Sequence, residues 1–223
     1  MTFLHQVGAI VAKDVAAEIR TRELASAMLV FAVLSLLIFS FALDLSGDLA
    51  RVAAPGVLWT TLTFAGLLEL NRSFVHEQQD GCIDGLLLAP MDRSAILCGK
   101  ALGNLIVMVT VESILLPLAS VLFGANLVHG AVLLVTFLGT LGYAIVGTLL
   151  AAVAVNTRAR EVMLPVLTLP LTVPLLIAVV QATAGLLEGA PLSDVQGWVS
   201  LVVAYDLTMT AVAILTFGFV VGE

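Results

Sequence analysis

The chain has 223 residues, of which 61% are hydrophobic and only 11% are charged, and its formal net charge is −7. A soluble domain is about a quarter charged, so this chain has too few polar side chains to cover a water-exposed globule. The composition indicates an integral membrane protein, and the negative charge argues against nucleic acid as a partner.

The first 24 residues predict an amphipathic helix. Apolar residues recur there at helical spacing, namely Leu4, Val7, Val11, Val15 and Ile19. Charged residues lie off that stripe, namely Lys13, Asp14 and Glu18. These charges interrupt any apolar core of a signal peptide, so we expect a helix in the inner membrane surface. The alternative is a plain cytoplasmic tail.

Six apolar stretches then follow, each close to the roughly 20 helical residues that cross a bilayer. They cover about 25–43, 52–70, 101–123, 130–155, 162–185 and 198–220. None shows regular β alternation, so helices are the only spanning option. We expect an all-α membrane protein with six transmembrane helices, folded as a single domain over residues 1–223.

The basic residues are distributed unequally between the two sides of this arrangement. Eight of the nine fall in segments 1–24, 71–100 and 156–161: Lys13, Arg20, Arg22, Arg72, Arg93, Lys100, Arg158 and Arg160. The connectors 44–51, 124–129 and 186–197 carry Arg51 alone. The positive-inside rule therefore predicts that both termini are cytoplasmic. The even number of spans agrees with this, because it places both termini on the same side of the membrane.

Two acidic residues lie inside the expected spans. Glu112 is near the middle of the third span, and Asp206 is in the sixth. Charge in a membrane is costly and often functional. Each carboxyl group could line a substrate path, as in an ion-coupled secondary transporter, or pair with another helix inside the bundle. We favour the second interpretation, because no cationic partner is visible within the membrane.

Small residues and prolines mark particular spans. Gly139, Gly142 and Gly147 in the fourth span, and Gly99-x-x-x-Gly103 at the start of the third, predict close helix packing. The fifth span contains "LPVLTLPLTVPLL", with Pro165, Pro170 and Pro174. Each proline removes a backbone donor, so this helix must kink or break. The prolines could form a hinge or simply a kinked scaffold.

The densest polar cluster is "HEQQDGCIDGLLLAPMDR" at 76–93. Its start, His76-Glu77, matches half of a zinc-protease motif, but Asp80 stands where a second histidine is needed, so we expect no metal site. The chain also lacks a phosphate-binding GxxxxGK[ST] loop, a nucleophile–base set and paired catalytic carboxylates, so we expect no catalytic residues and no enzyme activity.

Acidic residues alternate with Arg72 and Arg93 around this cluster: Glu69, Glu77, Asp80, Asp84 and Asp92. Gly81 and Gly85 interrupt the cluster, and Pro90 ends any helix that includes the leucines at 86–88. A short amphipathic helix of this kind suits docking into a groove of another protein. We expect an ATPase-coupling element formed by Glu77, Gln78, Gln79, Asp80, Gly81, Asp84, Gly85, Leu86 and Pro90; the alternative is a solvated loop.

These residues also carry a family resemblance. "ELNRSFVHEQQDGCIDGLLLAPM" at 69–91 resembles the cytoplasmic loop of the CcmB family, the permease subunit of the cytochrome c maturation ABC transporter. "APGVLW" at 54–59 and "LPLTVPLLI" at 169–177 are similar to the family's second and fifth spans, in the same order. The chain departs from the family pattern at Cys82-Ile83, where Ser/Thr-Leu is expected, and at Glu112, where an apolar residue is expected.

The resemblance implies an ABC-2-type permease in the bacterial inner membrane, with an N-terminal amphipathic helix and a coupling helix between spans two and three. It implies two copies of the ATPase CcmA, which binds ATP, the haem-handling proteins CcmC and CcmD, the haem chaperone CcmE, and one or two copies of this chain. The chain itself would need no cofactor. It would drive haem export or the release of haem-loaded chaperone. The alternative is a general ABC-2 exporter of a lipid, polysaccharide or drug.

Overall fold

The computed structural model describes residues 2–42, 48–79, 92–154 and 160–220. These residues form seven α-helices and contain no strand. In chain order the helices are α1 (Phe3–Thr21), α2 (Glu23–Ala42), α3 (Asp48–Gln79), α5 (Arg93–Phe123), α6 (Gly130–Ala154), α7 (Arg160–Leu187) and α8 (Gln196–Val220). The expectation of an all-α protein is confirmed.

Six of these helices are long and apolar enough to cross a membrane. The candidate spans are Glu23–Ala42, Val52–Arg72, Arg93–Phe123, Gly130–Ala154, Val162–Leu187 and Gln196–Phe217. All six match stretches expected from the sequence. The largest difference is at the third, which begins at Arg93 because Asp92 caps the helix by accepting a 3.0 Å hydrogen bond from the backbone N–H of Ser94.

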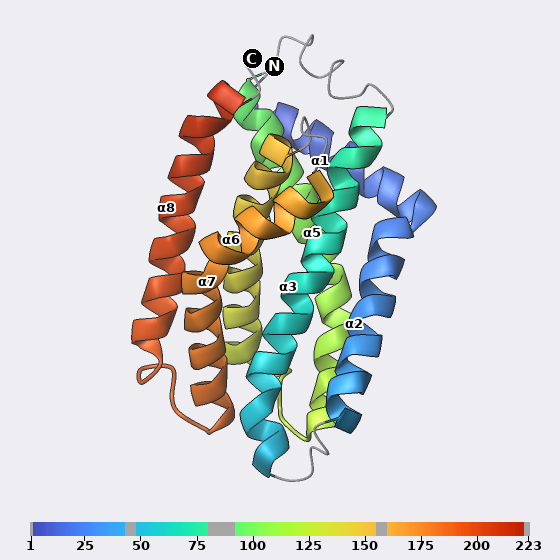
Figure 1. Ribbon diagram of the computed structural model, residues 1–223. Coiled ribbons are helices and arrows are strands. Elements are labelled where there is room, and N and C mark those ends of the chain that lie inside the picture. The colour runs from blue at the N-terminus through green and yellow to red at the C-terminus, as the bar shows by residue number, and fades with distance from the viewer. Residues whose placement is uncertain (1, 43–47, 80–91, 155–159, 221–223) are drawn as a thin grey trace.

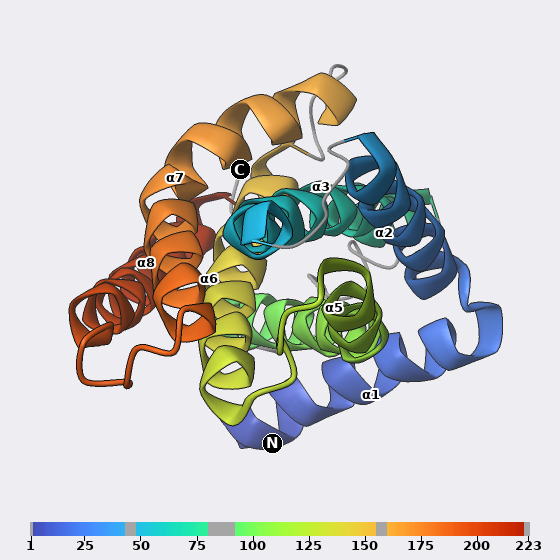
Figure 2. The same ribbon diagram turned by 90° about the horizontal axis from the view of Figure 1, so that it is seen from below.

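The six long helices lie side by side in one bundle, and α1 runs across their axes (Figures 1 and 2). Both termini lie at the end of the bundle where α1 is found, together with the C-terminal end of α3 and the N-terminal end of α5 (Figure 1). Figure 2 shows α1 lying along α5 at one edge of the bundle. The opposite end holds the α5–α6 and α7–α8 connections.

Glycines let the helices approach closely, as the sequence predicts. A Cβ added at Gly139 would overlap the Trp59 ring of α3, and one at Gly147 would overlap Leu70 of the same helix. The Trp59 indole N–H also donates a 3.1 Å hydrogen bond to the Thr183 hydroxyl of α7. Helices α3, α6 and α7 are therefore packed around Trp59 as a unit.

The three prolines of α7 do not break the helix, which runs without interruption from Arg160 to Leu187. The helix is bent instead: its first half crosses the bundle obliquely before it turns to run beside α8 (Figure 1). In the bent stretch the Tyr205 hydroxyl of α8 donates a 3.0 Å hydrogen bond to the carbonyl of Leu171. The expected kink is confirmed, while the role of Pro165, Pro170 and Pro174 as a hinge stays a prediction.

The expected N-terminal helix is found as α1, while its position in the membrane surface stays a prediction; its buried face differs from the expected stripe. Leu4 and Ile19 are 80% and 66% exposed, whereas Gln6 and Ile10 are buried. The helix turns this face inward because Gly99 of α5 leaves room for the Ile10 side chain, which a Cβ at that position would overlap. The apolar stripe is therefore only partly directed at the bundle.

Candidate functional site

A buried ion pair joins α1 to α5 at the end of the bundle that holds both termini. The Lys100 ammonium lies 2.9 Å from a carboxylate oxygen of Asp14, and Lys100 is only 3% exposed. Lys13 lies 3.1 Å from the other carboxylate oxygen of Asp14. Gly103 lies beside Asp14 and has no side chain to obstruct it. Asp14 lies off the apolar stripe, as the sequence indicates, and its carboxylate is nevertheless directed at α5.

Glu69 of α3 is a further buried carboxyl group. It is 1% exposed, and neither carboxyl oxygen has a hydrogen-bond partner among the described residues. Lys100 was expected in the cytoplasmic segment 71–100, and the structure instead buries it within α5.

One ion pair and one hydrogen bond attach α3 and the start of α5 to the elements beside them. The Arg72 guanidinium, seven residues before the end of α3, lies 3.0 Å from a carboxylate oxygen of Glu23, at the beginning of α2. The backbone N–H of Asp92, just before α5, donates a 3.4 Å hydrogen bond to the side-chain oxygen of Gln6 in α1. The last part of α3 and the start of α5 are thus attached to α2 and α1, respectively.

The turn between α1 and α2, which we call the elbow (Thr21–Glu23), is held by Glu18. The Glu18 carboxylate accepts hydrogen bonds from the backbone N–H groups of Leu24 at 3.4 Å and Ala25 at 2.8 Å, and so caps α2. Arg22 adopts a left-handed conformation with φ 54°, and its N–H donates to the carbonyl of Glu18. This conformation is unfavourable for a residue with a side chain, so the capping bonds hold the elbow in place.

The expected ATPase-coupling residues are only partly described. Glu77, Gln78 and Gln79 form the last turn of α3 rather than a separate element. The others lie outside the described residues: Asp80, Gly81, Asp84, Gly85, Leu86 and Pro90. The expected coupling helix therefore stays a prediction. In the described part of the chain, no three His, Cys, Asp or Glu residues are grouped to hold a metal ion.

The two acids within the spans differ from each other. Glu112 is 5% exposed and accepts a 2.5 Å hydrogen bond from the Thr140 hydroxyl of α6, which confirms the expected pairing with another helix. A cavity of about 10 Å³ beside this pair has room for at most a single water.

Asp206 is 7% exposed, and neither of its carboxylate oxygens has a hydrogen-bond partner among the described residues. Its carboxylate packs against Gly142 of α6, where an added Cβ would overlap it. The pairing expected from the sequence is therefore found at Glu112 and not at Asp206.

Sequence reasoning missed the burial of Lys100 and Glu69 and the pairing of Lys100 with the partly buried Asp14. One signal could have revealed it: Lys100 directly follows the first glycine of the Gly99-x-x-x-Gly103 pair. A lysine beside such a packing face needs a carboxylate on the helix that packs there. Asp14 follows buried Ile10 by four positions on α1, so it was the carboxylate placed to meet it.

Comparison with known proteins supplies the family. The model of the family described as CcmB protein matches residues 5–221. The chain is similar to heme exporter protein B of Pseudomonas aeruginosa, with 29% identity over 196 residues and 87% of each chain covered. It is also similar to heme exporter protein B of Rhodobacter capsulatus, with 31% identity over 83% of this chain and 88% of the relative. With the family model matching nearly its whole length, the chain belongs to the CcmB family.

Proposed function

We propose that this chain is the membrane subunit of an ABC transporter for cytochrome c biogenesis. It couples ATP hydrolysis on a partner ATPase to haem export or to release of a haem-loaded chaperone. The observation that carries the proposal is membership of the CcmB family over residues 5–221, whose relatives are named heme exporter protein B. The whole of residues 1–223 serves as one permease domain, and ATP is bound by the partner.

The ATPase docks on the segment Glu77–Pro90. Helices α3 and α5 and the elbow transmit the movement of the ATPase to the membrane bundle. Support comes from two attachments on either side of the docking segment in the sequence, Arg72 to Glu23 and Asp92 to Gln6. A displacement of the docked segment would act directly on α3, α5 and the elbow. The buried Lys100–Asp14 pair makes α1 and α5 move together, because separating them would leave a buried charge unpaired.

Both termini are cytoplasmic, and α1 lies in the inner membrane surface. Of the described basic residues, six belong to α1, to the elbow, to the last third of α3 or to the start of α5: Lys13, Arg20, Arg22, Arg72, Arg93 and Lys100. These elements meet at the end of the bundle that holds the N- and C-termini (Figure 1). The positive-inside rule favours this end as the cytoplasmic one. The exposed Leu4 and Ile19 of α1 would then contact lipid.

The partners are two copies of the ATPase CcmA, the haem-handling proteins CcmC and CcmD, the haem chaperone CcmE, and a second copy of this chain where two are present. Between haem export and chaperone release we favour release. The six spans contain no histidine, and His5 and His129 lie near opposite ends of the bundle. A haem crossing through this chain would therefore meet no histidine ligand on its way.

Absorption spectra of the chaperone CcmE, purified from a strain that lacks this chain, test the proposal. Under release, the chaperone accumulates with haem bound and remains attached to its loading partner. Under export, the chaperone is empty, because haem does not reach the outer face. A chaperone that loads and releases haem normally in this strain would contradict both forms of the proposal.

A further inference from the structure

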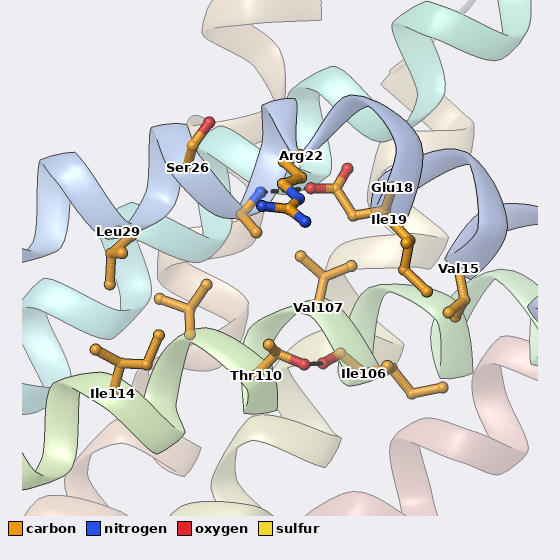
Figure 3. A pocket seen from close by; sticks show the side chains of 12 residues that line it. Val15, Glu18, Ile19, Arg22, Ser26, Leu29, Ile106, Val107, Thr110 and Ile114 are labelled. Carbon is orange, nitrogen blue, oxygen red and sulfur yellow. Dashed lines mark hydrogen bonds between the residues drawn. The ribbon is translucent and has the colours of Figure 1, made fainter.

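A groove lies in the angle between α1 and α2, with α5 as its floor (Figure 3). Its volume is about 540 Å³. Its apolar walls come from Val15 and Ile19 of α1 and Leu29 of α2, and its floor from Ile106, Thr110 and Ile114 of α5. We call it the elbow groove. With a rise of 1.5 Å per residue, the floor from Ile106 to Ile114 is roughly 12 Å long.

The elbow groove lies at the depth of the membrane. Its floor and one wall belong to the candidate spans Arg93–Phe123 and Glu23–Ala42. The apolar side chains at its rim are open to the surroundings: Ile106 is 41% exposed and Ile114 is 51% exposed. In a bilayer these side chains face hydrocarbon, so the space between them is filled by apolar chains and not by water.

One end of the groove carries the guanidinium of Arg22, and Glu18 lines the same end. Figure 3 shows both side chains at the α1–α2 corner. Both nearby acids are already engaged, since Glu18 caps α2 through Ala25 and Glu23 pairs with Arg72. No described carboxylate lies within ion-pair distance of Arg22. The groove therefore combines a cation at the membrane boundary with an apolar channel that leads along α5.

We propose that the elbow groove binds one glycerophospholipid of the adjacent leaflet. Its phosphate lies at Arg22, and one acyl chain runs between α2 and α5. The charge and the apolar length match an amphipathic anion. Haem is a poorer match, because the groove lining contains no histidine, cysteine, methionine or tyrosine to serve as an axial ligand. A bound lipid would brace the elbow to which Arg72 is attached.

Photolabelling tests this site. The full chain is placed in phosphatidylcholine nanodiscs with a trace of phosphatidylglycerol that carries a diazirine in its acyl chain. The label should concentrate on the groove-lining stretches of α2 and α5. Ile106→Trp fills the groove and should lower this labelling at least fivefold. Leu102→Trp is the matched control, because Leu102 is 40% exposed one turn earlier on α5 and does not line the groove.

The charge is tested separately. Arg22→Ala should weaken the labelling about fivefold, the change that about 1 kcal/mol per basic residue near an anionic surface produces. Arg22→Lys should restore most of it. Arg20→Ala, which removes an equal charge from α1 outside the groove, should leave it unchanged. These three variants test whether a lipid phosphate binds at Arg22, even if Ile106→Trp fails to fold.

Three results would overturn the proposal. Equal labelling in all variants means that only general lipid contact is detected. Labelling that disappears when the chain is purified with its partner subunits means that a partner helix occupies the groove. A haem absorption band that is lost in the Ile106→Trp variant means that haem occupies the groove.

Discussion

Replacing Lys100 by methionine should be far more damaging than its position near the end of a span suggests. The substitution keeps the length and apolar stem of the side chain but removes the ammonium group 2.9 Å from Asp14. Asp14 then loses the closer of its two cations. Breaking a buried pair by removing one partner costs about 3–5 kcal/mol. We expect about 3 kcal/mol, the lower end, because Asp14 keeps Lys13 at 3.1 Å.

The free energy of unfolding can be measured in mixed micelles, by titration with sodium dodecyl sulfate followed by helical circular dichroism. About 3 kcal/mol is roughly a hundredfold change in the unfolding equilibrium. Lys13→Met is the matched control, because the Lys13 side chain is 44% exposed, and an exposed pair contributes less than about 1 kcal/mol. Adding Asp14→Asn to Lys100→Met should recover about 1 kcal/mol or more, since the unpaired charge is then gone.

If Lys100→Met costs no more than Lys13→Met, then no buried pair joins α1 to α5, and the proposed transmission between these helices fails.

Three further predictions concern docking, topology and packing. Asp80→Lys should weaken co-purification of the ATPase by about 2–5 kcal/mol, with normal membrane insertion; full association and activity would contradict docking at this segment. Reporter fusions should be periplasmic after Gly47, Gly124 and Gly189 and cytoplasmic after Asp80 and Thr157, and one central reporter on the other side would refute the topology. Gly142→Ala should destabilise the bundle by about 1–3 kcal/mol because its methyl group would overlap Asp206, whereas Gly8→Ala, with open space around it, should not; equal unfolding free energies of the two variants would contradict this packing.

The spans were predictable because the length and apolar character of a membrane helix are local properties of the sequence. The close approach at Gly139 and Gly147 was predictable for a related reason, since small residues inside an apolar helix indicate contact with another helix. The kink of α7 likewise followed from prolines, whose effect on a helix does not depend on its neighbours.

The buried charges were not predictable in this way. A local count of polar residues assigns Lys100 to a loop, whereas its burial depends on Asp14, a partner that lies far away in the sequence. The rotation of α1 has the same origin. Its inward face is decided by Gly99 and Lys100 of α5, and the apolar stripe of α1 itself carries no information about them.

The content of holo-cytochromes c in the periplasm reports on the proposed role in cytochrome c biogenesis. It should be measured by haem staining in a strain that lacks this chain, and again after the chain is restored. We expect holo-cytochromes c to be absent without the chain and to return with it, while b-type haem proteins stay normal throughout. Normal holo-cytochrome c levels in the strain without the chain would refute this role and favour a general exporter.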